Sequence, residues 1–192
     1  MKLEEISNIY AGVVPSRKQA TEQEQKHKYK LISLKSISKF GTINPSDFTD
    51  YYTKDKLALK YLVKNKDIIV RIRPPIYAGV IDDDFQDVAI PSYCINLRLN
   101  KDHINKILPE FIALYINSKK AQKEFNKDIV GTMITMIKPT SIRKLEIPII
   151  PMNKQKQIIR ISKILNKELK LLKELIELKE KYYNQINEKL VI

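Results

Sequence analysis

The sequence predicts an α/β protein with a globular domain over residues 1–150 and a long C-terminal coiled-coil helix over residues 151–192. Hydrophobic residues make up 43% of the 192 residues, which is enough for a core. Short runs rich in Val and Ile, bounded by Pro, Asn and Asp, favour a twisted mixed sheet with peripheral helices. Beyond Pro151 the sequence contains no Gly or Pro and is dominated by Lys, Glu, Leu and Ile, which indicates one helix.

The first forty residues predict little regular structure. Residues 2–14 carry a spaced apolar set, which predicts a short helix or turn and then a short strand. Residues 16–30 are almost wholly polar, so we expect an exposed loop or a solvated helix. Residues 31–40 fit a short helix or an irregular strand that ends at Gly41.

Two β pairs are predicted in the middle of the domain. Residues 61–72 contain a polar turn between two apolar runs, and Pro74 and Pro75 end the second run. Residues 76–81 and 88–99 flank an acidic tip and form the second predicted pair.

The rest of the domain is predicted to be mainly helical. Pro109 opens a helical pattern over residues 109–125, at a position where its missing N–H is harmless. A turn is expected at Gly131, a short helix over residues 139–144 and a final strand over residues 145–150.

The long helix carries a heptad pattern. Apolar residues alternate at spacings of four and three, which is typical of a coiled-coil seam, and a second apolar stripe runs beside them. The apolar face is therefore wide enough for more than one neighbour. We expect the domain to cover only the beginning of the seam, and an antiparallel second copy to cover the rest. The predicted dimerisation residues are Leu165, Leu169, Leu172, Ile176, Tyr183, Ile186 and Leu190.

Charge and cysteine content indicate the class of partner and compartment. Lys and Arg number 35 and Asp and Glu number 22, so the net charge of +13 favours a polyanionic partner. A single cysteine, Cys94, cannot form an intramolecular disulfide and is expected to be a buried structural thiol. The charged N-terminus does not match a secretory signal and no stretch reaches the length of a membrane span, so we expect a soluble cytoplasmic protein that does not bind membranes.

Catalytic patterns are missing from the sequence. His27 and His103 lie in polar surroundings without further ligands at metal-binding spacing. Asp82, Asp83 and Asp84 are expected to form a solvated turn, and the sequence contains no phosphate-binding glycine loop. We therefore expect a non-enzymatic protein with no metal site and no cofactor.

The C-terminal third contains a recognisable series of motifs. It has Gly131-Thr132, then Leu145-Glu146-Ile147-Pro148, then Pro151, Gln155 and Ile158 at the start of the long helix. This order resembles the DNA specificity (S) subunits of type I restriction-modification systems. The resemblance continues more weakly upstream. The sequence departs from the family pattern at Lys66, where Gly is usual, at Ile150, where a second proline is usual, and at Asn153-Lys154, where acidic residues are common.

The resemblance implies half of a usual subunit: one target recognition domain and one conserved helix. Such a chain would contact a half-site in double-stranded DNA, and its helix would set the spacing to a second copy in a homodimer. Methylation and cleavage would belong to a DNA methyltransferase (M) subunit and a restriction and translocation (R) subunit.

The basic residues of the predicted loops and strand ends are the candidate DNA contacts. Arg71 and Arg73, on one face at the end of a strand, are the expected base-reading pair, with Tyr77 beyond them. The expected phosphate contacts lie in loops and around the glycine turn. They are Arg17, Lys18, Lys54, Lys56, Thr132, Lys138 and Thr140.

Two other classes of function remain open at this point. A non-catalytic coiled-coil adaptor would have no DNA affinity at physiological salt. An RNA-binding module would carry aromatic residues on an open sheet for base stacking, whereas the tyrosines here are dispersed.

Overall fold

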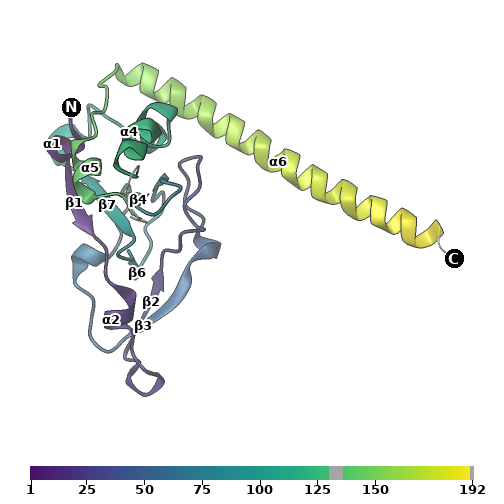
Figure 1. The fold of residues 1–192 in the computed structure, drawn as a ribbon, viewed down its shortest axis with the longest axis horizontal. Coiled ribbons are helices and arrows are strands. Elements are labelled where there is room, and N and C mark those ends of the chain that lie inside the picture. The colour runs from purple at the N-terminus through teal and green to yellow at the C-terminus, as the bar shows by residue number, and fades with distance from the viewer. Residues whose placement is uncertain (130–135, 191–192) are drawn as a thin grey trace.

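The computed structural model describes residues 1–129 and 136–190, and it confirms the α/β class with a globular domain and a long C-terminal helix (Figure 1). The strands are β1 (Ser7–Ala11), β2 (His27–Leu31), β3 (Thr49–Thr53), β4 (Ile68–Arg71), β5 (Ala78–Val80), β6 (Val88–Ala89) and β7 (Cys94–Leu99). The α-helices are α1 (Leu3–Ile6), α2 (Pro15–Lys18), α3 (Pro109–Ile116), α4 (Lys119–Ile129), α5 (Pro139–Lys144) and α6 (Met152–Leu190).

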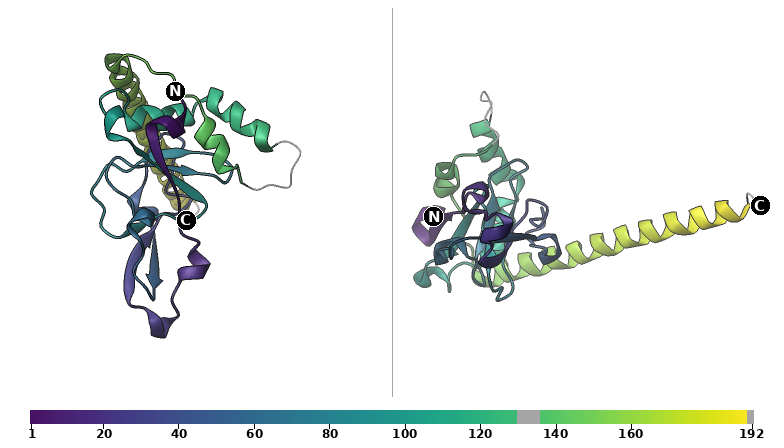
Figure 2. Two further views of the ribbon diagram at one scale, coloured as in Figure 1. Left: turned by 90° about the vertical axis from the view of Figure 1, so that its left-hand side faces the viewer. Right: turned by 90° about the horizontal axis from the view of Figure 1, so that it is seen from below.

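The strands form two sheets. The first is antiparallel with the order β1-β7-β4-β5, and the second is mixed with the order β3-β2-β6. Figure 1 shows the second sheet at the end of the domain remote from α1 and α5, and Figure 2 shows how far α6 extends beyond the domain.

Strand β4 is the centre of the first sheet because it is apolar on both faces. Ile68, Ile69 and Val70 are all fully buried. Ile68 and Val70 belong to the core under α3 and α5, whereas Ile69 packs with Cys94 in a second core on the other face. A continuous apolar run is buried most fully between two strands and two layers.

This central place explains two wrong predictions of strand pairing. The first apolar run of residues 61–72 is not a strand, and its Leu62 bridges Ala89 rather than β4. Strand β5 does not pair with residues 88–99, because β4 lies between β5 and β7. The turn over residues 64–67 is present, with Lys66 at a φ of 67°.

The prediction of a loop or helix over residues 16–30 was wrong for its last part, which is β2. Tyr29 and Leu31 face a small core while Lys28 and Lys30 point outward toward Asp50. Two inward residues are too short a pattern to recognise as an alternation. Residues 32–40, expected as helix or irregular strand, contain only turns and one bridge at Ile37.

Two further predicted elements differ from the structure. The helix over residues 109–125 is interrupted at Asn117, whose side chain accepts a hydrogen bond from the Ala78 N–H and donates one to the Ala78 carbonyl. It therefore becomes α3 and α4. Residues 145–150 are not a strand, and only Glu146 makes a bridge, to Lys2. Pro148 interrupts this run and cannot donate to a ladder.

A buried ion pair joins the turn after residue 63 to β7. The Asp67 side chain, 1% exposed, accepts two 2.7 Å hydrogen bonds from Arg98 and one each from the Asn96 side chain and the Lys64 N–H. Asp67 also raises the pKa of Arg98 by hydrogen bonding. Three of these four hydrogen bonds come from side chains of β7, so they fix the turn relative to the sheet.

We predict that Asp67→Ala lowers the free energy of unfolding by about 3–5 kcal/mol, because Arg98 is left without its partner. Urea denaturation of the full chain measures this. The exposed Asp102→Ala serves as the control and should change stability by less than about 0.5 kcal/mol. Equal stabilities of the two variants would contradict this role for the pair.

Candidate nucleic-acid interface

Three residues of α6 attach the helix to the globular domain. Gln155 is fully buried and accepts a hydrogen bond from the Leu108 N–H while donating to the carbonyls of Lys106 and Ile150. Ile159 is 8% exposed in the main core. Asn166 donates to the Phe40 carbonyl at 3.2 Å. These three residues are the docking face, and two attachment points about 16 Å apart fix the direction of the helix.

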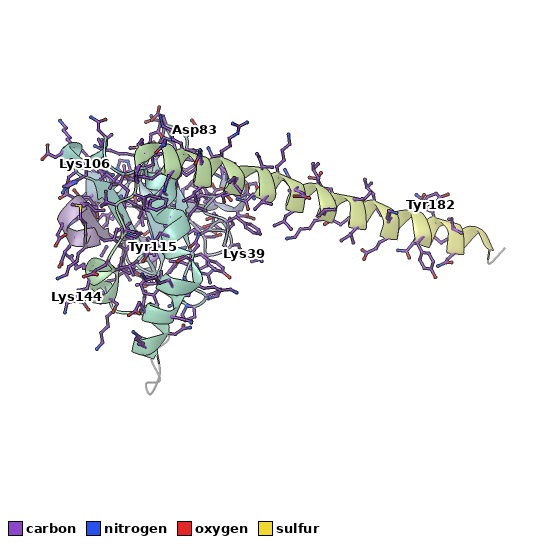
Figure 3. All side chains as sticks on the ribbon, turned by 90° about the horizontal axis from the view of Figure 1, so that it is seen from above. Lys39, Asp83, Lys106, Tyr115, Lys144 and Tyr182 are labelled. Carbon is purple, nitrogen blue, oxygen red and sulfur yellow. The ribbon has the colours of Figure 1, made fainter. Side chains whose placement is uncertain are left out.

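The heptad seam lies on another face of α6. Ile158 and Leu165, next to docking-face residues in the sequence, are 42% and 51% exposed. The prediction that the domain covers the beginning of the seam was therefore wrong. The other described seam residues, Leu169, Leu172, Ile176, Tyr183 and Ile186, are also exposed. Figure 3 shows side chains projecting on all sides of α6 beyond the domain, with Tyr182 near its free end. The side chain of Leu190 lies outside the described part.

The second apolar stripe is just as exposed as the seam. Its described members are 49–66% exposed, and the two stripes together form one broad apolar face. They are Ile161, Ile164, Leu171, Leu175, Leu178 and Tyr182. An apolar face of this extent marks a surface for protein contact.

The two arginines of the predicted base-reading pair, Arg71 and Arg73, have different surroundings in the structure. Arg71 directs its guanidinium to three backbone carbonyls, those of Leu34, Arg73 and Pro74, and stacks 5.7 Å from the Tyr77 ring. Arg71 thus holds two loops together. Arg73 is exposed, lies 5.6 Å from the Tyr93 ring and donates no side-chain hydrogen bond within the described part of the chain. Tyr77 is half-buried.

The predicted phosphate contacts near the second sheet are also of two kinds. Lys54 pairs with Glu24 at 2.8 Å, and this carboxylate raises the pKa of Lys54. Lys56 lines a cavity of about 330 Å³ together with Lys26 and Lys28, and it is exposed. Arg17 and Lys18 are exposed on α2, remote in sequence from this cavity.

A basic cleft of about 690 Å³ lies between α4 and α5. Lys138 and Thr140, both predicted phosphate contacts, line it. The sequence interpretation missed three more lysines in this cleft, Lys120, Lys127 and Lys144, because they become neighbours only when the two helices pack. The cleft also contains two acidic residues, Glu146 and Glu124, and Glu124 pairs with Lys127 at 2.9 Å. Thr132 and the turn at Gly131 lie outside the described residues.

Other chemistry is limited in the described ranges. Cys94 is fully buried, and burial raises the pKa of its thiol to about 12, so it is an inert structural residue as expected. Over residues 1–129 and 136–190, no three His, Cys, Asp or Glu side chains lie close enough together to hold a metal ion. No helix within these ranges is both long and apolar enough to span a membrane.

Solved structures share this fold. The HsdS subunit from Thermoanaerobacter tengcongensis matches with a TM-score of 0.65 and 13% identity, over 91% of this chain and 43% of that chain. A structure describing complex assembly and conformational transition of the type I R-M system matches with a TM-score of 0.66 and 14% identity, over 91% and 43%. The type I S subunit from M. genitalium matches with a TM-score of 0.54 and 18% identity, over 94% and 42%.

The chain thus spans less than half the length of each of these structures. No curated protein sequence matches it. The family model of the type I restriction modification DNA specificity domain matches residues 1–181, which is most of the chain and includes most of α6. The protein therefore belongs to the family of type I restriction-modification DNA specificity domains.

Proposed function

We propose that the chain is a half-length specificity subunit that recognises one DNA half-site and pairs with a second copy through α6. Residues 1–150 would be the target recognition domain, and residues 151–192 the helix for dimerisation and spacing. The observation that carries this proposal is the uncovered seam of α6.

Charge along α6 supports an antiparallel pair. The first half, residues 152–171, carries six basic residues and one acidic residue, whereas residues 172–190 carry four of each. A parallel pair would oppose the two basic halves, whereas an antiparallel pair sets each basic half against a neutral one. Like charges placed side by side are destabilising, so the antiparallel arrangement is favoured.

The length of α6 sets the scale of the target. Its 39 residues span about 58 Å, or about 1.7 turns of B-DNA at about 35 Å per turn. Two identical readers related by a two-fold axis would recognise an interrupted palindrome. A different partner half would give an asymmetric target.

The second apolar stripe supports further protein partners. A two-stranded coil buries the seam but leaves this stripe in water. We propose that the DNA methyltransferase subunit docks there and that it, with a restriction subunit, supplies the catalysis. The chain itself would carry no catalytic residue and no cofactor, and it would act in the cytoplasm.

The exposed basic residues of the domain support contact with DNA. Arg73, with its free donors beside the Tyr93 ring, is our candidate for base reading. The phosphate contacts would be Lys56 in its basic cavity and Lys138 and Thr140 in the cleft between α4 and α5. Arg17 and Lys18 remain candidates on α2, whereas Lys54 is partly neutralised by Glu24.

We predict that Arg73→Ala weakens binding to the target duplex, identified by selection from random sequences, by about 1–3 kcal/mol, with little effect on random duplex. The double variant Lys56→Ala with Lys138→Ala should weaken binding to the target and random duplexes alike and reduce the salt dependence of the affinity. Fluorescence anisotropy with the full chain, repeated with the methyltransferase subunit, measures both. Absence of DNA binding at physiological salt in both settings would favour the adaptor class and overturn the proposal.

Arg71→Ala separates folding from recognition. Because three carbonyls accept hydrogen bonds from Arg71, this variant should lower the free energy of unfolding by about 1–3 kcal/mol, whereas Arg73→Ala should change it by less than about 0.5 kcal/mol. Urea denaturation compares the two. A stable Arg71→Ala variant with selective loss of target binding would return Arg71 to base reading.

We predict that Leu172→Glu with Ile176→Glu dissociates the dimer, because two charges would be buried in the seam. Analytical ultracentrifugation at micromolar concentration tests this. Lys181→Glu with Asn184→Glu, which adds two acids outside the seam, should remain dimeric. A monomeric wild-type chain would show that another protein covers the seam.

A further inference from the structure

A row of basic residues runs along α6 on a side that neither apolar stripe occupies. Its members, called here the basic stripe, follow one another at spacings of four and three residues and are all exposed. They are Lys156, Arg160, Lys163, Lys167 and Lys170. Residues at these spacings are neighbours on a helix surface.

The basic stripe is largely unneutralised. In the described part of the chain only Lys170 has an acidic partner, Glu174, at 3.8 Å. Glu110 borders the stripe in a groove of about 660 Å³ but bonds to Lys66 at 2.9 Å. The four successive like-charged pairs destabilise the helix by electrostatic repulsion. A bound polyanion would offset this repulsion.

The direction of the stripe follows from the docking face. Lys163 lies four residues after Ile159, and Lys170 lies four residues after Asn166. Four residues turn a helix by about 400°, so these two lysines point within about 40° of the side on which the domain sits. Lys156, Arg160 and Lys167 each come one residue after a docking-face residue and point about 100° from that side. The shared groove with Leu108 and Glu110 shows that Lys156 and Lys163 border the domain.

In a dimer paired through the seam, both domains would lie on one side of the helix pair. A duplex held by both domains must pass along that side, between the two half-sites. The apolar second stripe lies on the other flank of the seam, one residue earlier along the chain at each step. The basic stripe, two residues before the seam at each step, faces about 160° away from the seam, and Lys163 and Lys170 lie nearest the domain side. This polar side suits a duplex, whereas the apolar flank suits a protein.

We propose that the basic stripe of α6 binds the phosphate backbone of the spacer DNA between the two half-sites, without reading its sequence. From Lys156 to Lys170 the stripe covers about 21 Å, the axial rise of about six base pairs. This inference rests on the proposed function but concerns residues outside the recognition domain. Its ligand is duplex DNA, and an acidic protein surface is the competing outcome.

The test uses the full-length chain and a random-sequence duplex of about 30 base pairs, long enough to span both domains and the spacer. Lys163→Glu with Lys170→Glu should lower affinity about tenfold or more at low salt. The slope of log affinity against log salt should fall by about two for each chain, and so by about four for the dimer, one for each lost phosphate contact. Lys163→Gln with Lys170→Gln should give the same change of slope with a smaller loss of affinity.

The matched control is Lys60→Glu with Lys101→Glu, which changes net charge equally at exposed positions of the domain outside α6. Circular dichroism and ultracentrifugation should show all variants folded and dimeric. Equal losses in the stripe and control variants would overturn the inference and reduce the effect to net charge. So would unchanged DNA binding together with lost methyltransferase assembly. If the wild-type chain binds no duplex, the proposed function itself fails.

Discussion

The structure depends on one constraint: the broad apolar face of α6 is not covered by the chain that carries it. Gln155 and Asn166 attach the helix through polar contacts with backbone groups, and Ile159 is its main buried apolar residue. The remaining Leu, Ile and Tyr side chains face outward. Because burial of such a face is worth about 25 cal/mol for each Å² removed from water, association is strongly favoured.

In the proposed dimer, the attachment of α6 to the domain would also fix the position of one domain relative to the other. Gln155 satisfies three backbone groups around α3 and the segment before α6, and the Asn166 bond lies about 16 Å further along the helix. In the proposed dimer, a helix fixed at two points would transmit the orientation of one domain to its partner. The spacing between the two domains would then be a property of the helix rather than of a flexible linker.

Sequence periodicity predicted the elements whose apolar residues follow one uninterrupted pattern along the chain. The long helix, the short helix over residues 139–144 and the apolar run of β4 carry clear signals. Strand pairing was not predictable, because β4 could pair with either neighbouring run and only three-dimensional packing places it between β5 and β7. The break at Asn117 depends on Ala78, which is distant in sequence.

The same limit applies to the candidate interface. Arg71 and Arg73 look equivalent in sequence, and only the positions of three carbonyl groups make Arg71 structural. The cleft between α4 and α5 gathers lysines that sequence spacing does not connect. The seam stays a prediction, but the expectation that the domain covers its beginning was wrong, because the polar Gln155 rather than the seam makes the attachment.

The central claim is that two copies pair antiparallel through α6, and an inter-copy distance tests it most directly. A spin label at Lys154→Cys lies near the start of α6, while the buried Cys94 stays unlabelled. Electron double resonance on the full-length chain should give a distance of about 50 Å for fully overlapping antiparallel helices. A distance of about 10–20 Å, as expected for parallel helices at ordinary interaxial separation, or no dipolar coupling at all, would contradict the account.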